Sequence, residues 1–278
     1  MKPAAFDYLR ARDADEAVHW LQREGEGARI LAGGQSLMAV LNLRLATPAL
    51  LIDISRSEPL ARVEVEGGTL RIGAAATQAS IEWRPGLAQE LPLLALAFPH
   101  GSPFPIRNRG TVCGSIAHAD PSAELPLCLL ALRGEVLLRS ARGTRRVAAA
   151  DFFTGMLITA RKDDELIEAV RFPLAQPGTG HGFSEFSRRH GDFAICAIAA
   201  VADRRGLRVA VGGVVDRPVA RELPLLDGSA LDDALNEFAW ALDARDDPHV
   251  SAATRRHLVR RLGRRAVAQA LDSRSPEA

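Results

Sequence analysis

The feature that most constrains the fold is a pair of loops that combine glycine with hydroxyl side chains, each followed by a segment typical of a helix. The first is LAGGQSL at residues 31–37, and the second lies within RGTVCGSIAHADPSAELP at residues 109–126. Glycine lets the backbone approach a ligand closely, and consecutive N–H groups at a helix start can bind one anion. A single phosphate needs one such loop, so two loops favour a pyrophosphate held from both sides.

Each loop also has a simpler structural interpretation. Taken alone, the first is more typical of a tight strand-to-helix turn, because short glycine turns are common. Neither loop matches GxxxxGK[ST], and no GxGxxG follows the first strand, so the P-loop and Rossmann folds lose their main support. Beside the second loop, the carboxylates of Asp120 and Glu124 can accept hydrogen bonds from ribose or ribityl hydroxyls, or can simply cap and solvate a helix that begins near Pro121. The same two interpretations stay open for His118.

The rest of the chain predicts two units. Apolar periodicity predicts a first helix after Asp13, strands at 29–32 and 50–54, hairpins that turn at Gly67-Gly68 and near Arg142-Gly143, and helices at 77–83, 87–98 and 125–132. Between residues 173 and 182 the composition shifts to Pro, Gly, Gln and Thr, which is typical of a linker. Beyond it we expect three strands and then two helices, at residues 182–187, 193–203, 207–215, 231–243 and 252–271. Strands followed by helices give an α+β order.

The composition argues against several classes of function. With 35 Lys plus Arg against 34 Asp plus Glu, the formal charge is +1, so no strong net field attracts the chain to nucleic acid or to an acidic membrane. The opening MKPAAFDYLRARDADE has no apolar core of signal-peptide length, and no stretch reaches the ~20 apolar residues of a membrane helix. We therefore expect no integral membrane segment and a cytoplasmic location. Cys113, Cys128 and Cys196 show no CxxC spacing, so no metal site is expected here and any iron–sulfur cluster would belong to a partner.

Three segments together carry a specific resemblance. AGGQS at 32–36, IRNRGTVCGSIAHADPSAELP at 106–126 and RRHGDFA at 188–194 are similar to the landmark segments of the FAD-binding medium subunit of molybdenum hydroxylases, the family of carbon monoxide dehydrogenase and xanthine dehydrogenase. The resemblance covers almost the whole chain. It implies an α+β fold with a two-part FAD-binding domain of the vanillyl-alcohol-oxidase (PCMH) type at 1–175, with parts of about 1–55 and 56–175. A small α+β C-terminal domain, a three-stranded sheet plus helices, would follow at 176–278.

The resemblance also implies a set of cofactor-binding residues. The FAD pyrophosphate would lie between two groups of residues, Ala32, Gly33, Gly34, Gln35 and Ser36 on one side and Thr111, Val112, Cys113, Gly114 and Ser115 on the other. Glu124 matches the position of an acid on the ribityl chain, with His118 and Asp120 beside it. Phe193 matches a residue against the isoalloxazine ring, in a loop shaped by Gly191 and Asp192, although it could also be a core residue at the head of a strand.

One departure from the family pattern concerns Cys113, which stands where many relatives have glycine. Either the backbone there works without a positive φ, or the side chain points away from the ligand. The resemblance further implies partners: a large molybdopterin subunit that oxidises the substrate and a small subunit with two [2Fe-2S] clusters, assembled as a dimer of heterotrimers. This chain would pass their electrons through FAD to a terminal acceptor, with no catalytic side chain of its own. The alternatives are a freestanding FAD-dependent oxidase or reductase of the same fold, and a scaffold that has lost FAD.

Overall fold

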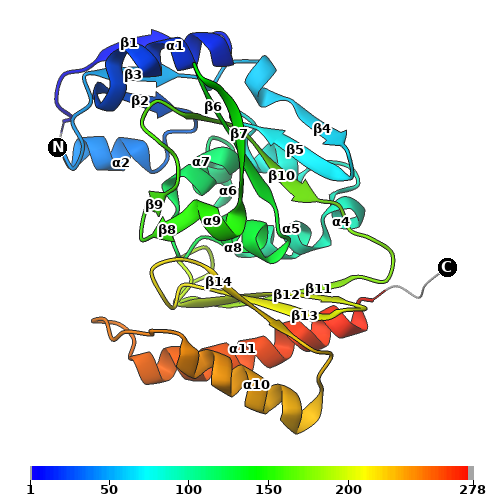
Figure 1. Ribbon diagram of the computed structural model, residues 1–278. Helices are drawn as coiled ribbons and strands as arrows, with labels where there is room; N and C mark the ends of the chain where they lie inside the picture. The colour runs from blue at the N-terminus through cyan, green and yellow to red at the C-terminus, as the bar shows by residue number, and fades with distance from the viewer. Residues whose placement is uncertain (1, 275–278) are drawn as a thin grey trace.

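The computed structural model describes residues 2–274, and its main sheets follow one another along the chain (Figure 1). A parallel three-stranded sheet has the order β1-β3-β2, from β1 (Asp7–Arg10), β2 (Ala28–Leu31) and β3 (Leu50–Asp53). An antiparallel five-stranded sheet has the order β4-β5-β10-β6-β7, from β4 (Val63–Glu66), β5 (Thr69–Gly73), β6 (Glu135–Ser140), β7 (Gly143–Ala148) and β10 (Leu166–Pro173). An antiparallel four-stranded sheet follows in sequence order, from β11 (Gly180–Phe186), β12 (Cys196–Asp203), β13 (Gly206–Gly212) and β14 (Val219–Leu223). The small hairpin of β8 (Phe153–Gly155) and β9 (Ile158–Thr159) lies between β7 and β10 in the sequence.

The helices connect and cover these sheets, and their bounds are α1 (Ala14–Glu24), α2 (Leu37–Asn42), α3 (Gln78–Glu82), α4 (Leu87–Glu90), α5 (Pro92–Ala97), α6 (Phe104–Arg107), α7 (Val112–His118), α8 (Glu124–Ala131), α9 (Ala149–Phe152), α10 (Gly228–Ala241) and α11 (Ala252–Asp272). Asp13 caps α1 by accepting a hydrogen bond from the Glu16 N–H at 2.9 Å, as its sequence predicts. The single helix expected at 87–98 is instead two, because Pro92 has no N–H to continue α4 and begins α5.

The four-stranded sheet is covered on both faces, as Figure 1 shows. One face packs on α5 and α8 and contributes Phe183, Ala197 and Ala199 to the large hydrophobic core of the first unit. The other face packs against α10 and α11 and forms a second core. Helix α8 is apolar all round, with Leu125–Ala131 entirely buried, because it lies between the four-stranded sheet and the rest of the first unit. The loop between β11 and β12 is thereby held beside the start of α8.

Several sequence expectations were wrong in detail. The last sheet has four strands rather than three, because β14 is a short edge strand whose residues are only partly buried and carry little apolar signal. Strands β1 and β10 were not expected. The strand expected at residue 193 begins only at Cys196, which leaves Phe193 in the preceding loop. Within residues 2–274, no helix is both long and apolar enough to cross a membrane.

Candidate functional site

The two glycine loops lie directly against each other. A Cβ atom on Gly33 would lie 2.2 Å from the carbonyl oxygen of Arg109 and 2.6 Å from Cα of Gly110, so only glycine fits at this contact. A Cβ atom on Gly110 would in turn lie 3.6 Å from Cγ of Gln35. Segments far apart in the sequence therefore form one continuous backbone surface.

The first loop leaves its backbone donors unused. The N–H groups of residues 32–36 donate to no acceptor within residues 2–274. Gly34 has φ 72°, a left-handed conformation that turns the chain from β2 toward α2. Ser36 occupies the N-cap position of α2, but its side chain makes no capping hydrogen bond. Successive free N–H groups around a left-handed glycine are a typical site for an anion.

The second loop is fixed by its own cap and by a neighbouring segment. Thr111 caps α7 by accepting a hydrogen bond from the Gly114 N–H at 2.9 Å. The Val112 N–H donates to the carbonyl oxygen of Ala76 at 3.2 Å, and the Gln78 N–H donates to the carbonyl oxygen of Gly110 at 2.8 Å. These bonds hold the loop in place while it forms one wall of the surface. Ser115 lies half-buried one turn into α7.

The structure shows how Cys113 is accommodated where many relatives have glycine. Its side chain is buried in the main core, and its Sγ donates to the carbonyl oxygen of Ile72 at 3.4 Å. Its φ is not positive, because the residue lies within α7. Burial raises the pKa of the thiol to about 12. The side chains of both Cys113 and Val112 point into the core, so only their backbone can face a ligand.

The acidic residues beside the second loop have separate surroundings. Helix α7 ends at His118, which is half-buried, and Ala119 is left-handed with φ 54°. Asp120 then stabilises the turn by accepting a hydrogen bond from the Ser122 N–H at 2.8 Å. Glu124 begins α8, so the two acids do not share one helical face as their spacing allowed.

Glu124 is the acid left without a partner. Its carboxyl accepts no hydrogen bond from another residue within 2–274, and its Oε2 lies 3.6 Å from the position a Cβ atom on Gly101 would take. Burial, with a smaller contribution from Asp120, raises the pKa of Glu124 to about 7. A half-buried acid without a donor beside a free backbone surface is suited to accept hydrogen bonds from ligand hydroxyls.

The third predicted segment, at residues 188–194, belongs to the C-terminal unit and lies beside the loop at 101–103. Gly191 has φ 81°, and a Cβ atom there would lie 3.4 Å from Cδ of Pro103 and 3.6 Å from the carbonyl oxygen of Gly101. The Asp192 N–H donates to the carbonyl oxygen of Arg189 at 3.1 Å, which tightens the loop. Phe193 is 70% exposed, so its interpretation as a core residue is wrong. The loop at 188–194 thus meets the loop at 101–103, which also contacts Glu124.

Two further residues anchor this region. Neither was among the predicted site residues, although Arg107 lies in the landmark segment at 106–126. Arg107 forms a two-bond ion pair with Glu82, at 2.8 and 3.0 Å, and also donates to the carbonyl oxygen of Ser102. Both side chains are largely buried, so the pair fixes the loop at 101–103 against α3. On the other side, the Arg255 guanidinium of α11 donates to the carbonyl oxygens of Ile195 and Gly213 and holds the end of the 188–194 loop.

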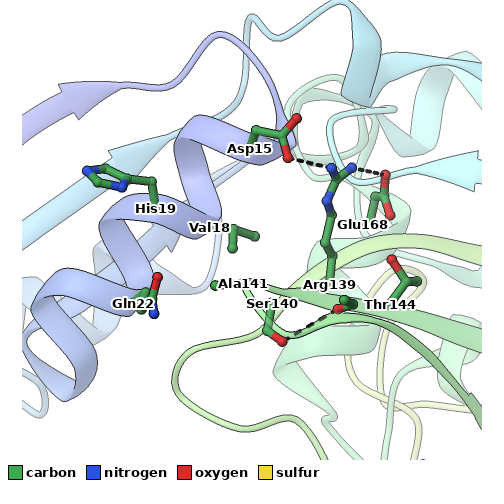
Figure 2. A pocket seen from close by; sticks show the side chains of 10 residues that line it. Asp15, Val18, His19, Gln22, Arg139, Ser140, Ala141, Thr144 and Glu168 are labelled. Carbon is green, nitrogen blue, oxygen red and sulfur yellow. Dashed lines mark hydrogen bonds and ion pairs between the residues drawn. The ribbon is translucent and has the colours of Figure 1, made fainter.

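One cavity lies away from these loops. It is an open polar groove of about 580 Å³ between α1 and the β6–β7 hairpin, where Arg139 joins Asp15 to Glu168 (Figure 2). None of the predicted cofactor-binding residues line it. The groove is therefore separate from the surface formed by the glycine loops.

Comparison with known proteins identifies the fold and the family. Residues 4–175 match the family described as the FAD binding domain in molybdopterin dehydrogenase. The chain belongs to this family. It is 39% identical to the nicotine 6-hydroxylase medium subunit of Paenarthrobacter nicotinovorans, over 97% of this chain and 99% of that subunit.

Solved structures extend the likeness to the C-terminal unit. The carbon monoxide dehydrogenase of Hydrogenophaga pseudoflava that lacks the Mo-pyranopterin moiety superposes with a TM-score of 0.93, 29% identity and coverage of 99% of this chain and 100% of that chain. Quinoline 2-oxidoreductase from Pseudomonas putida 86 superposes with a TM-score of 0.91, 31% identity and coverage of 98% and 99%. The resemblance seen in the three sequence segments and the α+β FAD-binding fold expected from it are confirmed.

Proposed function

We propose that this chain is the flavin subunit of a molybdenum hydroxylase complex, accepting electrons from a [2Fe-2S] subunit onto FAD and passing them to a terminal acceptor. The observation that supports this proposal most is the row of free N–H groups at residues 32–36, in a loop that packs at Gly33 against the second loop. Membership of the FAD-binding family and identity over nearly the full length of a medium subunit support the proposal. The chain is accordingly an oxidoreductase subunit.

The surface described above fits FAD by the chemistry of its donors and acceptors. Two sets of residues would hold the pyrophosphate, Ala32, Gly33, Gly34, Gln35 and Ser36 with free N–H groups and Thr111, Val112, Cys113, Gly114 and Ser115 at the start of α7. Glu124 would accept hydrogen bonds from ribityl hydroxyls, with His118 and Asp120 shaping the turn beside it. Phe193 and Asp192 would lie at the ring. FAD, when bound, supplies exchange of one or two electrons, and the chain's residues supply binding and orientation.

We further propose that the partners are a large molybdopterin subunit and a small [2Fe-2S] subunit, in a cytoplasmic dimer of heterotrimers. The exposed aromatic side chains of Phe186 and Phe193, at 46% and 70% exposure, support a partner near the 188–194 loop. The sheets also support domains at 1–175, with parts of about 1–55 and 56–175, and at 176–278. The link from β10 to β11 has no strand or helix between Pro173 and Gly180.

Titration of the apoprotein with FAD and with FMN tests the proposal. FAD should bind without a covalent link, so acid denaturation should release it into the supernatant. FMN lacks the pyrophosphate and should bind at least about a hundredfold more weakly, since it forfeits two charge-assisted hydrogen bonds or more. Equal affinity for FMN and FAD contradicts the two-loop site. Bleaching of the flavin by aldehydes or N-heterocycles without partner subunits would favour the freestanding oxidase.

A further inference from the structure

A third segment lies beside the second glycine loop and belongs to none of the three landmark segments. Residues 76–78 run next to residues 110–112 and are joined to them by an isolated β-bridge and two backbone hydrogen bonds. In one of these bonds, the Gln78 N–H donates to the carbonyl oxygen of Gly110 at 2.8 Å. Thr77 caps the short helix α3, which begins at Gln78. The backbone of Gln78 is therefore fixed relative to the second loop.

The side chain of Gln78 lies where the two glycine loops meet. A Cβ atom on Gly110 would lie 3.4 Å from Nε2 of Gln78 and 3.6 Å from Cγ of Gln35. The Gln35 side chain is held there because its Nε2 donates to the carbonyl oxygen of Gly33 at 3.1 Å. Gln78 thus reaches from α3 over Gly110 toward the first loop, whose N–H groups at 32–36 donate to no acceptor within residues 2–274.

The side-chain amide of Gln78 is an unused donor. It makes no hydrogen bond within the described part of the chain, residues 2–274. Although the residue is half-buried, its polar atoms are not among those sealed from solvent. An amide nitrogen offers two N–H donors and carries no charge. A half-buried amide with both donors free is suited to a ligand that brings its own acceptors.

We propose that Gln78 is a further residue of the cofactor site, and that its side-chain amide donates to a phosphate oxygen of FAD at the junction of the two loops. An anion bound by the free N–H groups at 32–36 would have this amide as an additional donor, because the first loop and Gln78 both lie against Gly110. Hydrogen bonds to an ionised phosphate are stronger than those between neutral groups. The identity of the ligand rests on the proposed function.

The first test compares the affinity of the wild type, Gln78→Glu and Gln78→Met for FAD and for riboflavin, which has no phosphate. Glutamate has the same size but replaces the donor by a carboxylate that repels phosphate, so FAD binding should weaken at least about a hundredfold. Methionine only removes the donor, so the loss should be about tenfold, the effect of one hydrogen bond to a charged group. Riboflavin should bind all three proteins within about threefold.

The matched control is Gln22→Glu, which makes the same change on the exposed face of α1, in the groove of Figure 2. It should bind FAD like the wild type. Thermal unfolding of the apoproteins separates lost contacts from misfolding, since Gln78→Met adds no charge and should melt close to the wild type. FAD affinity that is unchanged in both Gln78 variants overturns the proposal. Equal losses for FAD and riboflavin also overturn it, because Gln78 would then only support the fold.

The second test uses ADP, which carries a pyrophosphate but no flavin. In calorimetric titrations ADP should bind the wild-type apoprotein and bind Gln78→Glu much more weakly, in about the ratio found for FAD. A wild type that binds ADP but not FAD would contradict the proposed function and leave the phosphate contact of Gln78 in place. FAD binding in the wild type with unchanged ADP and FAD affinities in Gln78→Glu would contradict the role of Gln78 alone. A wild type that binds neither ligand would overturn both.

Discussion

The sharpest test of the two-loop site is Gly33→Ala. The new Cβ would lie 2.2 Å from the Arg109 carbonyl oxygen, a contact with backbone that cannot rotate away. Real Cβ contacts stay above about 3.0 Å, so the loops at 32–36 and 109–115 must separate by about 1 Å. The φ of Gly33 is not positive, so this effect comes from the contact alone and not from backbone conformation.

The separation sets the magnitude of the expected effect. Charge-assisted hydrogen bonds to phosphate are about 2.7–2.9 Å long and contribute roughly 1.5–3 kcal/mol each, so a shift of about 1 Å removes those made by one wall. Loss of two such bonds costs about 3–6 kcal/mol, which weakens FAD binding roughly 10²- to 10⁴-fold. Overpacking of this contact should destabilise the apoprotein by only about 1–3 kcal/mol, so the variant should remain folded.

Fluorescence titration of the apoprotein with FAD measures the affinity, and urea unfolding measures the stability. Gly27→Ala is the matched control, because its Cβ would meet only Cβ of Ala49 at 4.0 Å and its φ is not positive. The control should bind FAD like the wild type. Binding by Gly33→Ala within twofold of the wild type, in a folded protein, would refute the argument that the two loops jointly hold the pyrophosphate.

Three other predictions follow from buried groups. The three thiols, at Cys113, Cys128 and Cys196, are buried, so the native protein should not react with a disulfide reagent at pH 8 and the urea-unfolded protein should react fully; rapid labelling of the native protein would contradict this packing. Arg107→Met should lower the free energy of unfolding in urea by about 3 kcal/mol and weaken FAD binding, because it leaves the buried Glu82 carboxylate without a partner. Adding Glu82→Gln should restore part of the stability. Equal stability of the wild type and Arg107→Met would rule out an anchoring role. The pKa of Glu185 in the folded protein is about 8, above its ordinary 4.5, so its contribution to stability is full below pH 4.5 and is lost as the pH rises toward 8. The free energy of unfolding should therefore fall by at most about 1.4 kcal/mol per pH unit over this interval. Urea unfolding at several pH values should show a smaller slope for Glu185→Gln, and an unchanged slope would contradict the raised pKa.

Local signals predicted the parts of the fold that depend on neighbouring residues. The Asp13 cap, the Gly67-Gly68 turn and the apolar helix at 124–131 are set by residues close in sequence, and each was expected near its observed place. Strand β10 was missed, although it lies at the centre of the five-stranded sheet between β5 and β6. Its place depends on pairing with segments distant in sequence, which periodicity within one window does not reveal.

In the candidate site, too, the features that the sequence did not predict depend on contacts between residues distant in sequence. The sequence suggested Gly33 for close approach of a ligand, whereas the structure shows that glycine is needed there for a contact with residues 109–110, and the positive φ belongs to Gly34. Asp120 and Glu124 had the same two interpretations in the sequence, whereas the left-handed Ala119 starts a turn that Asp120 stabilises and Glu124 begins α8. Glu185 in FSEF looks like the solvent side of an alternating strand, and only the packing of β11 on α5 shows that its carboxyl oxygens are inaccessible to solvent. Which binding role each residue has stays a prediction.

In the proposed complex, electrons enter this chain from a partner's iron–sulfur cluster and reside on its FAD. Stopped-flow absorbance of the FAD-loaded chain, mixed anaerobically with a reduced [2Fe-2S] subunit from the same complex, measures this step directly. The reduced partner should bleach the flavin rapidly, and the chain alone should not be bleached by aldehydes, alcohols or N-heterocycles. Flavin that stays oxidised in the presence of the reduced partner, or that is reduced by an organic substrate without it, would contradict the account.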